Sequence, residues 1–343
     1  MLGVVTFVEF RRLPAELQPD LGPIAPALRT AGLDCLGMAT TDEGTPIERR
    51  FELRSGADPA LTLGALWWGP SDLQMQLGPG QAIRAMRLTS GPATLEITWR
   101  GDTAAARGWG AGATEALDLV PGLIGELDDA PPLVAHHPIV GELARRLPGL
   151  RLTRGAPVIE MLVNSIIGQK VTGLEARRSQ RSLLTRFGER APGPLGLTLP
   201  PSPETLAHTP YWAFHTVGLE RRRADAIRAA AASAPSLERI RTMPRDEGRR
   251  RLESVPGVGP WTAAETMRLA LGDPDAVSVG DFNLPRQVCW VLAGERDGDD
   301  PRMLELLEPY AGQRARVVLL IERSGLRPAR RAPRYAPRQI AGM

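Results

Sequence analysis

The five-residue segment VPGVG at 255–259 constrains this chain more than any other feature, because it must link two helices tightly. Residues 246–254 are compatible with a helix, and Pro260 suits the first position of a second run of good helix formers. Gly257 and Gly259 have no side chain, so we expect positive φ at both and close approach by another polymer. Amide N–H groups at the start of the second helix then face an anion, for which a phosphate is the natural candidate. An ordinary helix-turn-helix corner with a glycine cap is the alternative.

A single carboxylate, Asp281, lies 22 residues beyond Gly259, within the sequence VSVGDFNL at 277–284. A short apolar stretch ends there at a glycine, and we expect a helix from about Phe282 to Leu292. Aspartate is a favoured helix N-cap, so capping is the simplest role for Asp281. The helix dipole also keeps such a carboxylate ionised, which suits it to face a developing positive charge. The two roles are compatible.

Three blocks of sequence carry a resemblance to a known family: PGLRL with GQKV and its flanking helix (148–187), VPGVGPWTA (255–263) and VGDFNL (279–284). From about residue 130 to 325 the chain resembles the helix-hairpin-helix DNA glycosylases that carry the Gly-Pro-Asp signature. Within them it is most similar to DNA-3-methyladenine glycosylase II. The resemblance implies a DNA repair enzyme that flips a damaged nucleotide out of the duplex and cuts the bond between base and sugar.

By position in this family, Asp281 is the catalytic carboxylate, which stabilises the oxocarbenium-like sugar and orients or activates the attacking water. Most glycosidases use two carboxylates, one of them to protonate the leaving group. An alkylated purine already carries positive charge, so one carboxylate suffices. Family members that also nick the strand have a lysine where this chain has Trp261, so the resemblance implies hydrolysis without lyase chemistry. Trp261 either stacks on the flipped base or is a core tryptophan that braces the hairpin.

Lys170 is the only lysine in the chain and follows Gln169 in a break between two helical runs. In similar enzymes this loop pushes a side chain into the gap left by the flipped nucleotide, which assigns that place to Gln169 or Lys170. Lysine is a poor apolar wedge, so a phosphate contact is the alternative. The predicted DNA-binding residues are Gln169, Lys170, Gly257, Val258, Gly259 and Thr262.

Four residues are predicted to line the substrate pocket, namely Trp261, Glu265, Trp212 and Tyr310. Glu265 follows Trp261 by one helical turn, where relatives tend to place an aromatic residue, and an acid there attracts cationic bases or is simply solvated. Trp212 and Tyr310 are alternatively core aromatics. The family resemblance further implies a monovalent cation on the main-chain carbonyls of Glu253, Val255 and Val258.

The charge of the chain is divided along its length. Residues 1–140 hold 10 Lys and Arg against 17 Asp and Glu, a net charge of −7, whereas residues 141–343 hold 32 against 22, a net charge of +10. An arginine-rich C-terminal half is the expected footprint of phosphate binding, and double-stranded DNA is the predicted partner. Two cysteines, Cys35 and Cys289, cannot hold a four-cysteine iron–sulfur cluster, so we expect no such cofactor. Without a membrane span or signal peptide, we expect a cytoplasmic, nucleoid-associated monomer.

The predicted fold class is α+β, with an antiparallel-sheet α/β domain followed by an all-α glycosylase domain. A helix capped by Asp58 should run to Trp67, the sheet should end near residue 100, and residues 101–130 look helical. We expect strands at 47–53, 72–77, 81–89 and 93–100. The predicted divisions are 1–45 (poorly patterned), 46–130 (small α/β domain), 131–326 (helical domain) and 327–343 (basic, proline-rich tail).

Two functions from different classes remain open. The first is a monofunctional glycosylase for alkylated purines, and the second is a module that binds DNA or damage without chemistry, with Asp281 serving only as a cap. Excision of oxidised or deaminated bases is a weaker third interpretation. The sequence does not set the range of lesions, because the width of the pocket depends on side chains that a sequence does not place.

Overall fold

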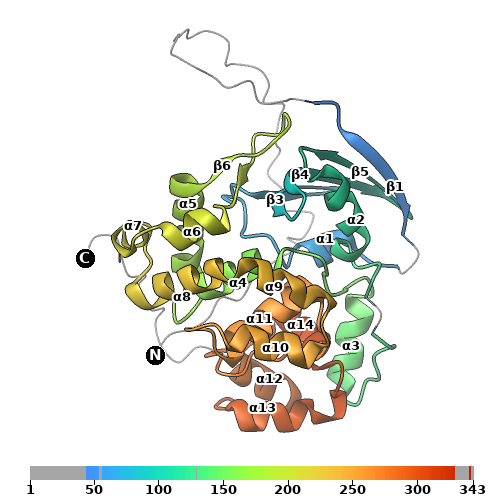
Figure 1. Cartoon of the computed structure of the whole chain (residues 1–343). Helices are drawn as coiled ribbons and strands as arrows, with labels where there is room; N and C mark the ends of the chain where they lie inside the picture. The colour runs from blue at the N-terminus through green and yellow to red at the C-terminus, as the bar shows by residue number, and fades with distance from the viewer. Residues whose placement is uncertain (1–43, 54–55, 129, 329–339, 341–343) are drawn as a thin grey trace, which may run out of the picture.

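The computed structural model describes residues 44–53, 56–128, 130–328 and 340. The expected N-terminal segment (1–45) and basic tail (327–343) therefore lie almost wholly outside the described residues. A sheet occupies one side of the molecule and helices make up the rest (Figure 1). Within the described part of the chain, no helix is long and apolar enough to cross a membrane.

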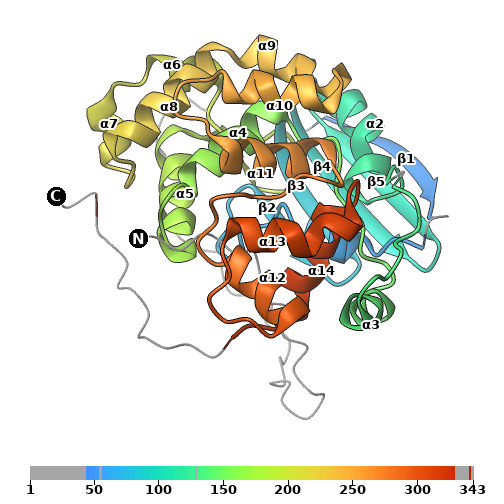
Figure 2. The ribbon, with the colours of Figure 1, turned by 90° about the horizontal axis from the view of Figure 1, so that it is seen from below.

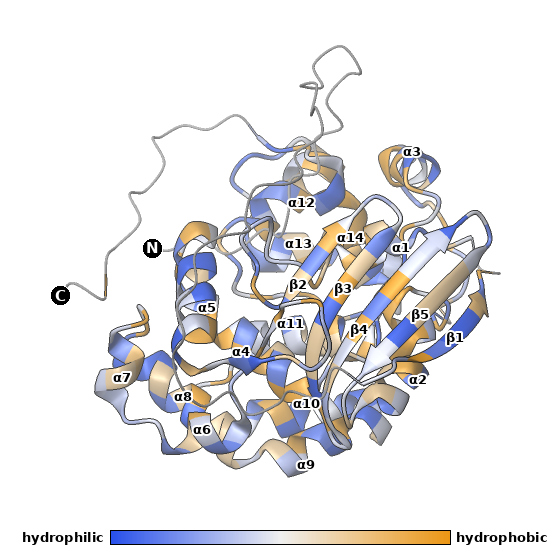
Figure 3. Ribbon diagram, turned by 90° about the horizontal axis from the view of Figure 1, so that it is seen from above, coloured by the Kyte–Doolittle hydropathy of each residue, from blue (hydrophilic) through white to orange (hydrophobic). Residues whose placement is uncertain are grey.

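Five antiparallel strands form the N-terminal sheet, in the order β1-β5-β4-β3-β2, which Figure 3 shows face-on. The strands are β1 (Ile47–Glu52), β2 (Met75–Gly78), β3 (Gln81–Leu88), β4 (Gly91–Arg100) and β5 (Thr103–Trp109). The predicted α+β class with an antiparallel sheet is confirmed. The predicted start of β2 is wrong by three residues, because the Asp72 carboxylate accepts the N–H groups of Gln74 and Met75 and so turns the chain before the strand.

The helix predicted over 101–130 is wrong in its first part, which is strand β5. Ala104 and Ala106 are buried while Thr103, Ala105 and Arg107 are exposed, the alternation of a half-buried strand. Alanine favours helices, so the local propensity of this segment is for a helix. Pairing decided the outcome: β5 lies between β1 and β4, and a turn at 101–102 returns the chain directly onto β4.

Two helices accompany the sheet. In α1 (Pro59–Leu63) the Asp58 carboxylate accepts the N–H groups of Ala60 and Leu61, as predicted for the cap. The helix ends at Leu63, four residues earlier than expected, and turns through 64–66. Helix α2 (Ala113–Leu123) packs on β4 and β5, with Leu117, Val120 and Leu123 fully buried.

Helices joined by loops, with one short strand pair, make up the remaining described chain. In order it forms α3 (Pro138–Arg146), α4 (Val158–Ile167), α5 (Gly173–Phe187), the short pair β6 (Glu189–Arg190) and β7 (Thr198–Leu199), α6 (Pro203–His208), α7 (Tyr211–His215), α8 (Arg221–Ala232), α9 (Ala234–Glu238) with a 3₁₀ turn at Arg239–Thr242, α10 (Arg245–Glu253), α11 (Pro260–Leu271), α12 (Leu284–Ala293), α13 (Asp300–Leu307) with a 3₁₀ turn at Glu308–Tyr310, and α14 (Arg314–Ser324).

Two hydrophobic cores divide these elements differently from their order in sequence. The first core joins the sheet and α2 to α4, α5, α8 and α11. The second core joins α3 to α12, α13 and α14, which Figure 2 shows grouped together with α3 beside α14. Because α11 belongs to the first core and α12 to the second, the connection at 272–283 crosses from one core to the other. Asp281 lies in this connection.

Candidate active site at the glycine hairpin

The predicted helix–hairpin–helix forms from α10, the segment 254–259 and α11. Gly257 has φ +86°, and a Cβ there would lie 2.7 Å from the Cβ of Ala226 on α8, so the turn requires glycine. The prediction of positive φ is wrong for Gly259, whose φ is −109° with extended ψ, because this residue is the N-cap of α11. No atom lies within 4 Å of a Cβ built on Gly259, so its absent side chain leaves open space.

The start of α11 offers backbone donors. Gly259 cannot cap the helix with a side chain, and Pro260 occupies the first helical position as predicted. The N–H groups of Trp261 and Thr262 therefore begin the helix without a side-chain partner, which is the arrangement that binds anions at helix N-termini. Val258 is buried, and its N–H already donates to the carbonyl of Val255 at 3.0 Å.

The loop between α4 and α5 is bonded directly to the hairpin, a contact that the sequence did not suggest. Nε2 of Gln169 donates to the carbonyl oxygen of Gly257 at 2.9 Å and to Oγ1 of Thr262 at 2.8 Å. The partners are 88 and 93 residues away, so no local pattern could have revealed them. Thr262 is buried, and its hydroxyl takes part in this bridge. Among the residues predicted to contact DNA, Gln169 and Thr262 thus join the α4–α5 loop to the start of α11 by their side chains.

Lys170 stands apart from its neighbours in this loop. Its side chain is exposed, and its φ of +54° makes it the only non-glycine residue with positive φ in the described chain. Such strain persists only where the surroundings enforce it, and it concentrates at functional sites. Arg223 supplies part of that enforcement: it is fully buried on α8 and donates to the carbonyl of Ile167 at 2.7 Å, just before the loop.

The Asp281 carboxylate is half-buried and oriented by three donors. Oδ1 accepts the N–H groups of Asn283 at 2.7 Å and Leu284 at 3.0 Å, and so bonds to the start of α12. The predicted N-cap position is wrong by two residues, because α12 begins at Leu284 rather than Phe282 and its N-cap is Asn283. Oδ2 accepts Nε1–H of Trp261 at 3.3 Å. Burial raises the pKa of the carboxyl above its ordinary value and Glu265 adds to this, while the three donors act in the opposite direction. One aspartate thus joins the hairpin helix to α12.

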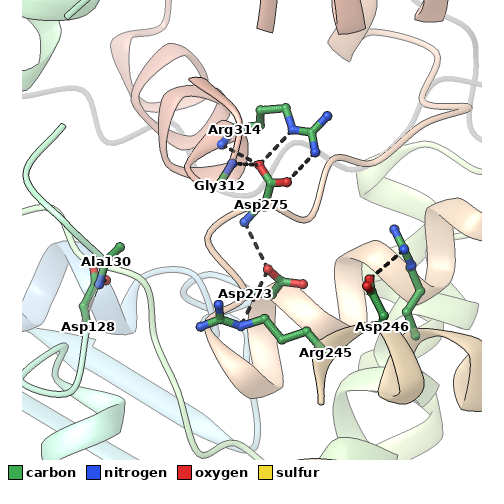
Figure 4. Close-up of polar contacts among 9 residues, drawn as sticks. Asp128, Ala130, Arg245, Asp246, Asp273, Asp275, Gly312 and Arg314 are labelled. Carbon is green, nitrogen blue, oxygen red and sulfur yellow. Dashed lines mark hydrogen bonds and ion pairs between the residues drawn. The ribbon is translucent and has the colours of Figure 1, made fainter. Parts of the chain in front are cut away.

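The connection that carries Asp281 is tied to three surrounding helices. Asp275 accepts the N–H of Gly312 at 2.8 Å and forms a two-pronged ion pair with Arg314 at the start of α14 (Figure 4). Asp273 lies 4.0 Å from Nε of Arg245 on α10. Nearer the carboxylate, the N–H of Gly280 donates to Asp300 of α13 at 2.9 Å. These contacts hold a segment that lacks regular structure, which fixes the position of the acid.

Glu265 is not solvated, so that alternative is wrong. The residue is 9% exposed, its Oε2 pairs with Nη2 of Arg268 at 2.7 Å, and its Oε1 accepts the hydroxyl of Ser278. Glu322 of α14 joins the same group: burial raises its pKa to about 7, while Arg268 pulls in the opposite direction. Two carboxylates, Glu265 and Glu322, and the guanidinium of Arg268 therefore lie close together beside Asp281. Sequence reasoning missed Arg268, Ser278 and Glu322, because the helical repeat hides them among core residues.

The two remaining pocket candidates lie elsewhere. Tyr310 is 4% exposed within the second core, where its ring meets that of His136 edge-on with centroids 5.3 Å apart. Trp212 is 65% exposed on the outer helix α7. Trp261 is partly buried and, with Glu265, lines a cavity of about 10 Å³, far smaller than a base. A base placed beside Trp261 therefore needs side chains to move.

Comparison with known proteins agrees with this geometry, although no family model matches the sequence. Over 126 residues the chain is 30% identical to the DNA-3-methyladenine glycosylase 2 of Escherichia coli strain K12, covering 36% of this chain and 45% of that protein. Over 144 residues it is 25% identical to a putative DNA-3-methyladenine glycosylase of Bacillus subtilis, covering 41% and 49%. The matched stretch thus spans less than half of either relative.

Solved structures match over a larger part of the chain. A 3-methyladenine DNA glycosylase from Archaeoglobus fulgidus superposes with a TM-score of 0.68 at 21% identity, covering 80% of this chain and 97% of that one. An 8-oxoguanine glycosylase/lyase of Clostridium acetobutylicum gives a TM-score of 0.61 at 13% identity, covering 82% and 97%. The chain therefore has the fold of the helix-hairpin-helix DNA glycosylases. Its sequence is similar to the DNA-3-methyladenine glycosylase II branch, which confirms the resemblance.

Proposed function

We propose that this protein is a monofunctional DNA glycosylase that flips alkylated, cationic purines such as 3-methyladenine out of duplex DNA and hydrolyses their bond to the sugar. The observation that carries the proposal is the half-buried Asp281 carboxylate, held beside the hairpin with one oxygen on Trp261. The similarity to glycosylases named for 3-methyladenine favours alkylated purines as substrates. The reaction would begin base excision repair.

The chemistry follows from charge. As the bond between an alkylated purine and its sugar breaks, the sugar becomes positive and the base leaves without protonation. An ionised Asp281 stabilises that sugar and orients water for attack, which one carboxylate can do when the leaving group is already cationic. Trp261 stands in the position where strand-nicking relatives carry a lysine, so a Schiff base has no amine there and hydrolysis is the outcome. The indole face attracts the cationic ring.

The hairpin would hold DNA by the phosphates of the DNA backbone. The N–H groups of Trp261 and Thr262 donate to a phosphate, which the open surface at Gly259 lets approach. Strained Lys170 reaches the gap left by the flipped nucleotide or its flanking phosphate. A monovalent cation held by the carbonyls of Glu253, Val255 and Val258 would add positive charge to the hairpin. The Val255 carbonyl already accepts one hydrogen bond, and its second lone pair leaves it able to bind a cation as well.

Incubation of the purified full chain with methylated duplex DNA tests the proposal. We expect release of free 3-methyladenine and intact strands that break only after alkali treatment. Release of no base by the wild-type protein, with binding retained, would instead support the second candidate, a DNA-binding module without chemistry. The double hydrogen bond from Asp281 to the start of α12 is the observation that favours this candidate, because a cap needs no reaction to explain it.

A further inference from the structure

The turn that carries Asp281 is bonded to α11 at both of its ends. The N–H of Asp281 donates to the carbonyl oxygen of Ser278 at 3.3 Å, and Gly280 between them has φ +90°, which is typical of a type II turn. At one end, the Asp281 carboxylate accepts the indole N–H of Trp261. At the other end, the Ser278 hydroxyl donates to Oε1 of Glu265. Trp261 and Glu265 are one helical turn apart on α11, so they lie on the same face of that helix.

The contact between Ser278 and Glu265 is buried and has its own support. Ser278 is 5% exposed and Glu265 is 9% exposed, so water competes little for their hydrogen bond. The second oxygen of Glu265, Oε2, pairs at 2.7 Å with Nη2 of Arg268, which is also on α11. The carboxylate is therefore held against its own helix by Arg268 and presents its other oxygen to the turn. A fully bonded polar network of this kind rigidifies the parts that it joins.

This second contact matters because DNA would be bound at the start of α11. The N–H groups of Asn283 and Leu284 orient the Asp281 carboxylate relative to α12, a different helix. Relative to α11, the bond from Trp261 at 3.3 Å is a single contact, about which the turn can rotate. The Ser278 contact one helical turn away prevents that rotation. Misplacing a catalytic group by about 1 Å can cost about 100-fold in rate, so this restraint bears directly on the proposed reaction.

We propose that Glu265 and Ser278 are positioning residues for the proposed glycosylase reaction, which hold Asp281 in place relative to the hairpin that binds DNA. The inference rests on the proposed function. It gives Glu265 a role other than the predicted attraction of cationic bases, because both of its oxygens are already bonded within the protein. In this role neither residue contacts the substrate, so their loss should slow base release without weakening duplex binding.

Single-turnover release of 3-methyladenine from methylated duplex tests the hydroxyl. Ser278→Ala removes the donor, and Ser278→Thr retains it. We expect release to fall at least about tenfold in Ser278→Ala and to recover most of the loss in Ser278→Thr, with duplex affinity unchanged in both. The matched control is Ser179→Ala, which removes another hydroxyl of a residue that is 5% exposed, bonded to the carbonyl oxygen of Gly218 at 3.2 Å. This control should release base at the wild-type rate.

The outcomes separate the positioning role from the proposed function. Undiminished release in Ser278→Ala, or equal losses in the alanine and threonine variants, would overturn the positioning role and leave the glycosylase function intact. A parallel fall in duplex affinity would also overturn it, because the hydroxyl would then support DNA binding rather than the acid. Wild-type protein that releases no base would refute the proposed function, and the positioning role with it.

The charges around Asp281 allow a second readout that needs no substrate. Burial raises the pKa of the Asp281 carboxyl and Glu265 raises it further, while the indole N–H of Trp261 lowers it. Displacement of Asp281 from Trp261 therefore raises this pKa, whereas loss of the Glu265 charge lowers it. Four charged side chains on three helices lie near the turn, namely Glu265 and Arg268 of α11, Asp300 of α13 and Glu322 of α14.

The indole N–H resonance of Trp261 in the full chain, labelled with ¹⁵N-tryptophan and assigned by its loss in Trp261→Phe, should titrate with Asp281. Ser278→Ala keeps every charge but frees the turn, so its midpoint should move to higher pH. Glu265→Gln keeps an oxygen for the Ser278 hydroxyl and removes a charge, so its midpoint should move to lower pH. Glu204→Gln, on the exposed surface of α6, should leave the midpoint unchanged. An unmoved or lowered midpoint in Ser278→Ala would show that Asp281 stays on Trp261 without the hydroxyl, which would overturn the positioning role.

Discussion

Two of the regions in which the protein buries or half-buries carboxylates differ in the partners of those acids. Beside the hairpin, Asp281 and Glu265 have both oxygens engaged, by backbone N–H groups and Trp261 in one case and by Ser278 and Arg268 in the other. Parts of α4 and α5 line a cavity of about 500 Å³. There Glu160 has one oxygen engaged and one without a hydrogen-bond partner in the described chain. A fully bonded acid is oriented in advance for charge that develops nearby, whereas the second oxygen of Glu160 is not oriented by a donor.

The regions also differ in how they are assembled. Most of the hairpin site comes from residues 253–284, whereas the cavity draws on segments from Gln74 to Thr242. A site built mostly from one continuous segment can be recognised in the sequence as a motif. A wall gathered from six helices, strands or turns and the loops between them leaves no recognisable pattern in the sequence. We therefore expect substitutions beside Asp281, whose two oxygens are both bonded, to have larger effects than substitutions beside Glu160, which has one oxygen without a partner in the described chain.

The largest effect is expected for Asp281→Asn. Loss of the negative charge should lower release of 3-methyladenine by about 10²- to 10³-fold, as for removal of one pre-oriented electrostatic group. The asparagine oxygen can still cap α12, so duplex binding and melting temperature should stay close to wild type. The assay is single-turnover release from methylated duplex, with Asp246→Asn on the exposed face of α10 as control. Undiminished release would remove Asp281 from the reaction and erase the contrast with Glu160.

Glu322→Gln tests the acidic cluster behind the hairpin. Glu322 has a folded pKa of about 7 against an ordinary value of 4.5, so it stabilises the fold fully below pH 4.5, and that stabilisation is lost as the pH rises through 7. A neutral glutamine avoids the loss. The variant should match wild type near pH 4.5 and be more stable by about 1–3 kcal/mol at pH 8.5, from the size of the shift.

Urea denaturation at the two pH values measures this difference, with Glu308→Gln on the exposed surface as control. A variant less stable than wild type at pH 8.5 would mean that the ionised Glu322 is a favourable partner of Arg268. The cluster beside Asp281 would then be an ordinary ion-pair network.

Two alanine substitutions separate fold from DNA contact within the hairpin. Gly257→Ala places a Cβ on a residue with positive φ, 2.7 Å from the Cβ of Ala226. This variant should therefore lower the free energy of unfolding by about 1–3 kcal/mol. Gly259→Ala meets no atom and keeps an allowed φ, so stability should change by less than about 1 kcal/mol, as expected at an N-cap. Duplex affinity should nevertheless fall about tenfold, comparable to one lost charge-assisted hydrogen bond.

Chemical denaturation and duplex titration at fixed salt give the two readouts for the glycine pair. Unchanged duplex affinity in Gly259→Ala would show that DNA does not approach the hairpin backbone. The ordinary helix-turn-helix corner would then be the correct interpretation of the segment.

The smallest effect on stability is expected for Gln180 in the wall of the cavity. Gln180→Met removes a buried donor that has no partner in the described chain, so the free energy of unfolding should rise by up to about 1 kcal/mol. Gln76→Met, the exposed control, should change it by less than about 0.5 kcal/mol. A destabilised Gln180→Met variant would mean that the amide has a partner such as a bound water. Glu160, in the same wall, would then resemble Asp281 and Glu265 in having its hydrogen bonds completed.

Much of the fold was predictable because its signals are local. The Asp58 cap, Pro260 at the start of α11 and the alternation in β3 and β4 each depend on neighbouring residues. The errors have two sources, long-range strand pairing that overrode local preference and the backbone conformation of a helix N-cap. The alanine-rich β5 is a strand because β1 and β4 flank it, and Gly259 has negative φ because it caps a helix while Gly257 makes the turn against α8.

The candidate site divides in the same way. The positions of the hairpin and of Asp281 at a helix start were readable, since glycine and a capping acid act over three or four residues. The Gln169 bridge, the burial of Tyr310 and the exposure of Trp212 were not, because contacts across 88 or more residues and packing of a ring depend on the whole arrangement of helices.

By itself, the amino-acid sequence determined helices such as α10 and α11, the turn between them, and the presence of a lone acid one connection later, because backbone conformation and capping are short-range. Only the tertiary structure decided what these parts face. It joined the sheet to α4–α11 in one core and α3 to α12–α14 in another, and it set Asp281 at the crossing against Trp261. It also left Oε2 of Glu160 and Nε2 of Gln180 without a hydrogen-bond partner among the described residues. Burial and long-range hydrogen bonds belong to the packed chain, and no segment of sequence carries them alone.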